Sequence, residues 1–182
     1  MSKAGLFDGP DVTLPEILKA REDRVARRSK AQSDERLPAL TLTIVMPGRV
    51  KDCPLSRQLA DAARAAIDLV IRDNAWDARL IWSGGDATGP ETLYLVDTTP
   101  ENLKRAMVNL EENHPLGRLW DLDVHSEKGE GLSRKQFGLP RRRCLVCGQE
   151  AHACARSRAH SLSELLEAME AMVLRWRDEE TK

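Results

Sequence analysis

Apolar and polar residues follow two different periods along the first part of the chain, and these periods predict helices and strands in turn. Thr13 and Glu16 form a capping box, so we expect a helix over about residues 14–31. A run rich in leucine, threonine and isoleucine, bounded by prolines, predicts a strand over residues 40–46. The apolar residues that follow have helical spacing, and Asp52 is the expected N-cap of this second helix.

The pattern continues with a hairpin, a helix and a strand. Residues 78–83 and 91–97 predict two strands, because a segment with three glycines and a proline separates them. Residues 100–112 begin with a proline and carry an apolar stripe, which predicts a helix. Residues 118–124 complete the series as a strand.

This order of elements predicts an α+β fold. Strand, helix, strand, strand, helix, strand is the β-α-β-β-α-β motif of ferredoxin-like folds, with a nucleotidyltransferase-like or palm-like arrangement as the alternative. In the ferredoxin-like arrangement the first and last strands lie side by side and antiparallel. We therefore expect the loop at residues 47–52 to meet the segment at residues 114–118 at one rim of the sheet.

Beyond the last strand the chain becomes turn-rich and basic, carries three cysteines, and then returns to a helical pattern. Ser161 and Glu164 form a second capping box, which predicts a C-terminal helix. The length is that of one domain. We expect this domain, residues 1–182, to consist of an N-terminal helical arm (1–36), an α/β core (37–126), and a basic, cysteine-rich segment with the C-terminal helix (127–182).

Composition narrows the class of protein. The chain of 182 residues is 41% hydrophobic and 31% charged, with a formal net charge of -1, which argues against extended disorder and against bulk attraction to nucleic acid. It has no run of eighteen apolar residues and no basic-then-apolar signal at its N-terminus. We therefore expect a cytoplasmic protein with neither a membrane nor a nucleic acid as its partner.

The last predicted strand carries a pair of carboxylates. Residues i and i+2 of a strand share a face, so Asp121 and Asp123 should point to one side, and Trp120, Leu122 and Val124 to the core. Two carboxylates ~7 Å apart along a strand repel each other unless a cation lies between them. Hard oxygen ligands of this kind suit Mg²⁺ shared with a phosphate. The alternative is the solvent-facing side of an edge strand.

Basic and polar residues surround this pair in the predicted fold. His114 and Arg118 lie just upstream, and the neighbouring rim brings Lys51, Asp52 and Arg57 close. Lys51 and the exposed N–H groups at the start of the second helix would suit a polyphosphate. A metal held by carboxylates in a basic environment is what phosphoryl or nucleotidyl transfer requires. His114 either donates to the phosphate oxygens or satisfies the turn.

Four blocks of sequence, in this order, resemble one known family: "LPEILKAREDRVARR", "MPGRVKD", "HPLGRLWDLDV" and "LPRRRCLVCGQEAHACARSRAHSLSELLEAM". The family is holo-citrate lyase synthase, the apo-citrate lyase phosphoribosyl-dephospho-CoA transferases. The resemblance implies a nucleotidyltransferase-type phosphotransferase. Its donor would be the 5''-triphosphate precursor of 2'-(5''-phosphoribosyl)-3'-dephospho-CoA. Its acceptor would be a serine of the acyl carrier protein, the γ subunit of citrate lyase, with diphosphate released.

The candidate site fits that reaction. Asp121 and Asp123 would hold Mg²⁺ on the α-phosphate and help to activate the serine. The departing diphosphate would be steadied by Lys51, Arg57 and Arg118. Two rival interpretations lie in other classes: a zinc-stabilised basic module that recognises RNA or an acidic protein without catalysis, and an accessory subunit of the lyase complex.

The cysteines suggest a second metal site. Cys144, Cys147, Cys154 and His160 have the spacing C-x2-C-x6-C-x5-H, which supplies four candidate ligands for structural zinc, with His152 as a spare. The alternative is a set of reduced cysteines that pack beneath the last helix.

Two basic runs complete the candidate chemistry. Arg141, Arg142 and Arg143 would contact the phosphates of the donor or an acidic carrier protein, or they would only keep the chain in solution. The first long helix carries its own arginines, which are interpreted as a solvated face or as a docking surface for an acidic partner.

Overall fold

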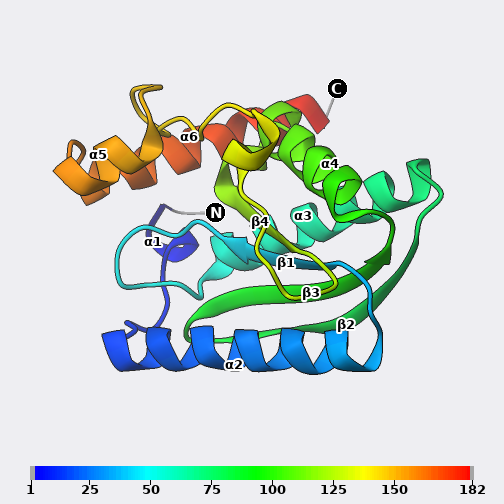
Figure 1. Cartoon of the computed structure of the whole chain (residues 1–182). Coiled ribbons are helices and arrows are strands. Elements are labelled where there is room, and N and C mark those ends of the chain that lie inside the picture. Colours follow the sequence, from blue (N-terminus) through cyan, green and yellow to red (C-terminus); the bar gives the residue numbers. More distant parts are fainter. Residues whose placement is uncertain (1–2, 181–182) are drawn as a thin grey trace.

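Residues 3–180 are described by a computed structural model, in which helices cover both faces of one antiparallel sheet (Figure 1). The strands are β1 (Ala39–Ile44), β2 (Asp77–Asp86), β3 (Gly89–Asp97) and β4 (Trp120–His125). Their order is β2-β3-β1-β4, and all neighbours are antiparallel. The helices are α1 (Lys3–Leu6), α2 (Leu14–Asp34), α3 (Pro54–Asp73), α4 (Pro100–Asn113), α5 (Ala151–Ser157) and α6 (Leu162–Glu180).

The first and last strands are neighbours, as predicted. In the antiparallel pairing of β1 with β4, Thr41 lies opposite Asp123 and Thr43 lies opposite Asp121. The contact continues beyond the strands, because the backbone N–H of Val45 donates to the carbonyl of Leu119 at 2.9 Å. The loop that leaves β1 and the segment that enters β4 therefore meet at one rim of the sheet.

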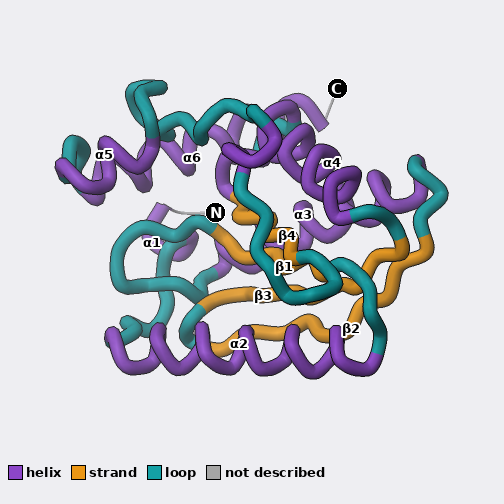
Figure 2. The backbone as a smooth tube through the Cα atoms, in the orientation of Figure 1, coloured by secondary structure: helices purple, strands orange, loops and turns teal. Residues whose placement is uncertain are grey.

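One face of the sheet is apolar and carries the main core. Leu40 and Leu42 of β1 and the buried residues of β4 pack there against α3 and α4, and Met169 and Val173 of α6 join the same cluster. Figure 2 shows α3 and α4 on the side of the sheet opposite to α2. Burial of this apolar surface is the main stabilising contribution to the fold.

The other face of the sheet is covered by α2, and ion pairs contribute to the contact between this helix and the sheet. A small apolar cluster, which includes Ala31 and Leu93, lies between helix and sheet. Beside it the buried carboxylate of Glu91 on β3 accepts hydrogen bonds from Arg24 Nε at 2.6 Å and Arg27 Nη2 at 2.8 Å. The basic helix is therefore partly anchored to the sheet, where the sequence predicted a solvated or docking surface.

Several predicted boundaries are shifted by one to three residues, and two of these shifts lie near the candidate site. The last strand begins at Trp120 and not at Arg118, because Gly117–Leu119 forms a 3-10 turn that packs closely on the end of α4. A Cβ at Gly117 would lie 2.5 Å from the carbonyl oxygen of Leu110, so only glycine fits this turn. The N-cap of α3 is Cys53 and not Asp52. Within residues 3–180, no helix has the length and apolar character needed to span a membrane.

Candidate functional site

The alternation along β4 separates the core from the candidate site. Trp120, Leu122 and Val124 are buried in the core, whereas Asp121 is half-buried and Asp123 is exposed. Both carboxylates line one cavity of about 510 Å³. The prediction that the two aspartates share a face is therefore confirmed.

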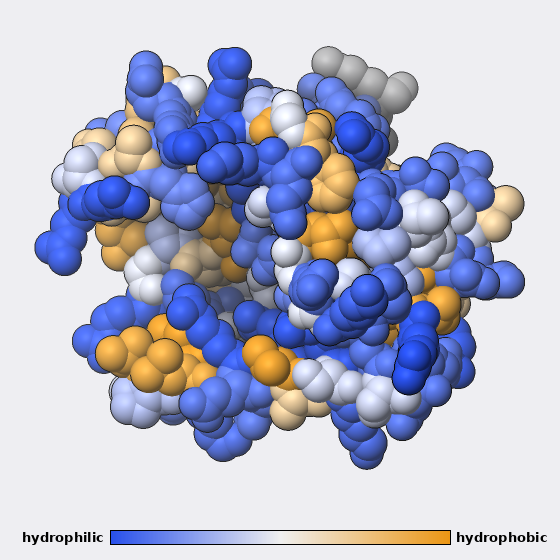
Figure 3. Space-filling model, viewed as in Figure 1, coloured by the Kyte–Doolittle hydropathy of each residue, from blue (hydrophilic) through white to orange (hydrophobic). Residues whose placement is uncertain are grey.

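Asp121 lies where three cavities meet. Besides the cavity that it shares with Asp123, it lines a polar cavity of about 180 Å³ beneath α2 and a larger one of about 750 Å³ beneath the cysteine-rich segment. In Figure 3 the molecule is hollowed between α2, below, and the side of α5 and α6, above. A ligand that extends from one cavity into another would pass this carboxylate.

The small polar cavity is basic. Arg21 and Arg24 reach it from α2, Lys51 from the loop after β1, and Gly89 from the start of β3. Lys51 Nζ donates to the carbonyl of Met46, and burial, with a contribution from the charge of Arg21, lowers the pKa of Lys51. Lys51 was predicted at this site, whereas the two arginines were not. Their i, i+3 spacing, which puts them on one helix face, was the available signal.

The large cavity combines apolar walls with basic groups. Arg118, Arg142 and Arg158 line it together with Asp121. Its apolar lining is formed by Val45, Met46, Pro47, Leu145, Ala151, Ala155 and Leu165. A volume of this size lies within the usual range for small-molecule and cofactor sites.

In the basic run at residues 141–143, one side chain contacts the aspartate pair. Arg142 Nη1 donates to Asp121 Oδ1 at 2.7 Å, and Arg142 Nη2 donates to the carbonyl of Trp120. Arg141 instead pairs with Glu150 at 2.6 Å. At Arg143 it is the backbone carbonyl that makes the contact, by accepting a hydrogen bond from Arg118. Of the three predicted arginines, Arg142 is therefore the one whose side chain contacts the carboxylate pair.

Asp123 is exposed and lies at a cavity that charged side chains of α4 and β4 also line. Burial, reinforced by the negative charge of Asp121, raises the pKa of Asp123, although Lys104 and Arg24 act in the opposite direction. A carboxyl group with a raised pKa retains a proton more readily and, once ionised, is a stronger base.

The backbone of Leu122, between the two aspartates, forms hydrogen bonds with side chains of α4. Glu111 accepts the backbone N–H of Leu122 at 2.9 Å, and Lys104 Nζ donates to the Leu122 carbonyl at 3.3 Å. Both side chains are buried. Glu111 also pairs with Arg134, so one carboxylate ties together α4, the edge of β4 and the following segment. The sequence did not predict this role, because it depends on the packing of α4 against the edge strand.

Three predicted residues lie away from the aspartates. His114 Nδ1 accepts a hydrogen bond from the backbone N–H of Leu116 at 3.0 Å, as expected if His114 satisfies the turn. Burial lowers the pKa of His114. Its ring lies 4.3 Å from that of Trp120. Asp52 and Arg57 pair with each other at 2.5 Å and line a separate hollow. The structure therefore does not bring Asp52, Arg57 or His114 to the cavities that Asp121 lines.

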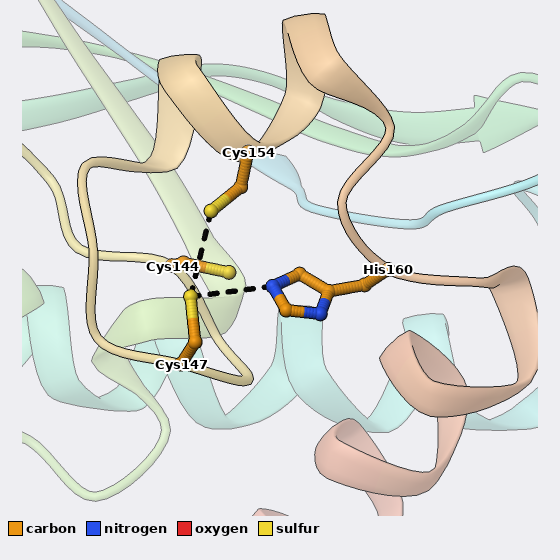
Figure 4. A group of neighbouring side chains, drawn as sticks. All are labelled: Cys144, Cys147, Cys154 and His160. Atoms are coloured by element: carbon orange, nitrogen blue, oxygen red, sulfur yellow. Dashed lines mark hydrogen bonds between the residues drawn. The ribbon is translucent and has the colours of Figure 1, made fainter.

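The predicted cysteine cluster is assembled. One ligand atom from each of Cys144, Cys147, Cys154 and His160 lies within 4.8 Å of the others (Figure 4). Burial opposes ionisation of Cys144, but hydrogen bonds from the backbone N–H groups of Cys147 and Val146 outweigh it and bring the pKa of Cys144 to about 7. These four side chains could hold a metal ion such as zinc.

Comparison with known proteins identifies the family. Residues 12–176 match the family model described as apo-citrate lyase phosphoribosyl-dephospho-CoA transferase. Proteins of that name from Citrobacter koseri and Escherichia coli O9:H4 are 40% and 38% identical, respectively, over 162 residues. Each alignment covers 89% of this chain and 88% of the relative. These matches confirm the resemblance found in the four sequence blocks. The chain belongs to the apo-citrate lyase phosphoribosyl-dephospho-CoA transferase family.

Proposed function

We propose that this protein is a transferase that attaches the phosphoribosyl-dephospho-CoA group to apo-citrate lyase. Membership of the family supports the reaction. The structural observation that carries it is the place of Asp121, between a small basic cavity and a large cavity with apolar walls. A non-catalytic basic module would need the arginines but would have no use for this carboxylate pair.

The donor in this proposal is the 5''-triphosphate of the ribosyl group, and its two ends differ in chemistry. The β- and γ-phosphates suit the small cavity, where Arg21, Arg24 and Lys51 supply positive charge. The dephospho-CoA portion suits the larger cavity, because its volume of about 750 Å³ and its apolar walls can accept an extended, partly apolar group. The α-phosphate would then lie next to Asp121.

The acceptor is a serine of the acyl carrier protein, the γ subunit. Its hydroxyl oxygen forms a bond to the α-phosphorus, and the bond from that phosphorus to the bridging oxygen of the diphosphate breaks. Diphosphate leaves with the bonding electron pair, and its charge is met by the small cavity. The serine proton passes to a carboxylate. Asp123 is the candidate acceptor because it lies in the same cavity as Asp121, next to the proposed position of the α-phosphate.

The donor set also fits Mg²⁺. Asp121 and Asp123 provide hard oxygen ligands in one cavity. Burial and, after it, the negative charge of Asp121 raise the pKa of Asp123, and a cation between the two carboxylates would relieve their repulsion. When bound, Mg²⁺ would neutralise phosphate charge. Arg142 contacts Asp121 and lines the large cavity, where its positive charge would lie beside the α-phosphate.

The proposal also includes the fold type, the metal at the cysteine cluster and the cellular compartment. The order β2-β3-β1-β4, with antiparallel neighbours and with α3 and α4 on one face, supports a ferredoxin-like core. Structural zinc is proposed for the cluster of Cys144, Cys147, Cys154 and His160. A thiolate metal site is stable where cysteines stay reduced, which supports the cytoplasm.

The test is the mass of the carrier. Purified protein is incubated with apo acyl carrier subunit, the triphosphate donor and Mg²⁺, and the intact carrier is weighed by mass spectrometry. We expect a gain equal to one phosphoribosyl-dephospho-CoA group and release of one diphosphate. No gain with a competent donor and carrier would refute the function, and an equal gain in the presence of excess chelator would refute the Mg²⁺ requirement.

A further inference from the structure

We infer that the cluster of Cys144, Cys147, Cys154 and His160 binds one zinc ion, and that this ion fixes the wall of the large cavity and the position of Arg142. The link to catalysis rests on the proposed function, whereas the metal site itself does not.

The first observation is that the segment has almost no core of its own. Among the described residues, none between Glu127 and Ala168 is fully buried, although buried residues occur on both sides of this stretch, at Ser126 and Met169. Leu132, Leu145 and Leu166 pack only partly against the main core. A chain segment of this length with so little buried surface usually needs a metal or a disulfide to hold one conformation.

The second observation is the geometry of the donors. Cys147 Sγ lies 3.5 Å from Cys154 Sγ and 3.3 Å from His160 Nε2. A tetrahedral zinc ion with Zn–S bonds of about 2.3 Å holds its ligand atoms roughly 3.5–4 Å apart, so the cluster is close to the size that zinc requires. Figure 4 shows all four side chains converging on one point from a turn, from α5 and from the segment before α6.

The local backbone has the form of a metal-binding knuckle. The N–H of Val146 points to Cys144 Sγ at 3.5 Å, as expected for the turn of a C-x2-C pair. A short antiparallel contact closes this turn, because Cys144 N donates to the carbonyl of Gln149 at 2.6 Å and Ala151 N to that of Arg142 at 2.9 Å. The ligands and Arg142 thus belong to one hydrogen-bonded unit.

This unit forms part of the candidate active site. Cys144, Cys154 and His160 line the same large cavity as Asp121 and Arg142. Arg142 precedes the first ligand by two residues, and Arg118 is tied to the carbonyl of Arg143. Binding of the ion would therefore hold the Arg142 guanidinium at 2.7 Å from Asp121. Without the ion, the position of Arg142 would depend on polar contacts alone, such as those of Arg142 with the Trp120 carbonyl and of Arg118 with the Arg143 carbonyl.

The test begins with metal content and needs neither donor nor carrier. Protein purified under reducing conditions from zinc-supplemented cells should contain about one zinc ion per chain. Cys154→Ser and His160→Ala should lower this content at least tenfold, and circular dichroism would show whether the core remains folded. His152→Ala is the matched control, since His152 lies in the same segment and cavity but outside the four-ligand group, and it should retain zinc.

Hydrogen exchange of the unmutated protein tests the structural role. Removal of zinc by a chelator should speed exchange in residues 141–160 while β1 and β4 stay protected, and zinc should restore the slow exchange. Zinc-free wild type, equal zinc in Cys154→Ser, or a native Cys147–Cys154 disulfide found by mass would overturn the metal site. Unchanged exchange after zinc removal would overturn the role in fixing Arg142. A carrier that fails to gain mass despite these results would count against the proposed function only.

Discussion

The two faces of the sheet are built from different chemistry, and β4 shows the difference within six residues. On the side of α3 and α4, its residues Trp120, Leu122 and Val124 belong to a continuous apolar core. On the side of α2, Asp121 and Asp123 face cavities and arginines. Burial of the apolar face stabilises the strand. This stabilisation offsets the free-energy cost of removing the charged groups on the other face from water. Alternate residues of β4 therefore belong to the core and to the candidate site.

The largest expected effect comes from the residue that connects the two faces. Glu111→Ala would leave the buried N–H of Leu122 and one hydrogen-bonding side of Arg134 without an acceptor. Loss of one partner from a buried charged network costs about 3–5 kcal/mol, so the midpoint of urea unfolding should fall strongly. Glu112→Ala, which removes a more exposed partner of Arg134, should cost about 1 kcal/mol or less. Equal losses would contradict the role of Glu111.

A smaller effect is expected in the basic cavity. Arg21→Gln would remove the proposed charge-assisted contact to the diphosphate end of the donor. The KM for the donor should then rise roughly 10–100-fold, which corresponds to about 1.5–3 kcal/mol. Arg57→Gln is the control, because this arginine pairs with Asp52 in a separate hollow. Steady-state kinetics in which Arg57→Gln has the larger effect would show that the diphosphate lies elsewhere.

The smallest effect concerns stability and pH. The raised pKa of Asp123 means that the folded protein binds this proton more tightly than the unfolded chain does. Its contribution to stability is therefore present below the unfolded carboxyl pKa of about 4 and is lost as the pH rises through the folded pKa. Asp123→Asn should thus raise the melting temperature at neutral pH without Mg²⁺, and the gain should vanish near pH 3.

Thermal melts of Asp77→Asn serve as the reference for this prediction, because Asp77 is an exposed strand aspartate outside the cavities described above. A neutral-pH melting temperature of Asp123→Asn that is lower than that of wild type would mean that the ionised carboxylate is stabilised by its neighbours.

Features set by local sequence could be predicted. The capping boxes at Thr13 and Ser161 are present because each depends on a side chain three residues away. The aspartate face follows from the pleat of one strand, and the cysteine cluster from short spacings. Features that depend on packing could not be predicted: Arg21 and Arg24 reach the site only because α2 crosses the sheet, and Glu111 only because α4 covers the edge of β4. Cys53 is the N-cap of α3, and Asp52 pairs with Arg57 instead.

The central claim is that transfer takes place at Asp121. The most direct measurement is the rate at which the carrier gains mass with Asp121→Asn, at saturating donor, carrier and Mg²⁺, beside wild type and Asp77→Asn. We predict a loss of roughly 10³-fold or more for Asp121→Asn with an unchanged unfolding midpoint, and a rate near that of wild type for Asp77→Asn. A carrier modified by Asp121→Asn at the wild-type rate would place the reaction centre elsewhere in the molecule.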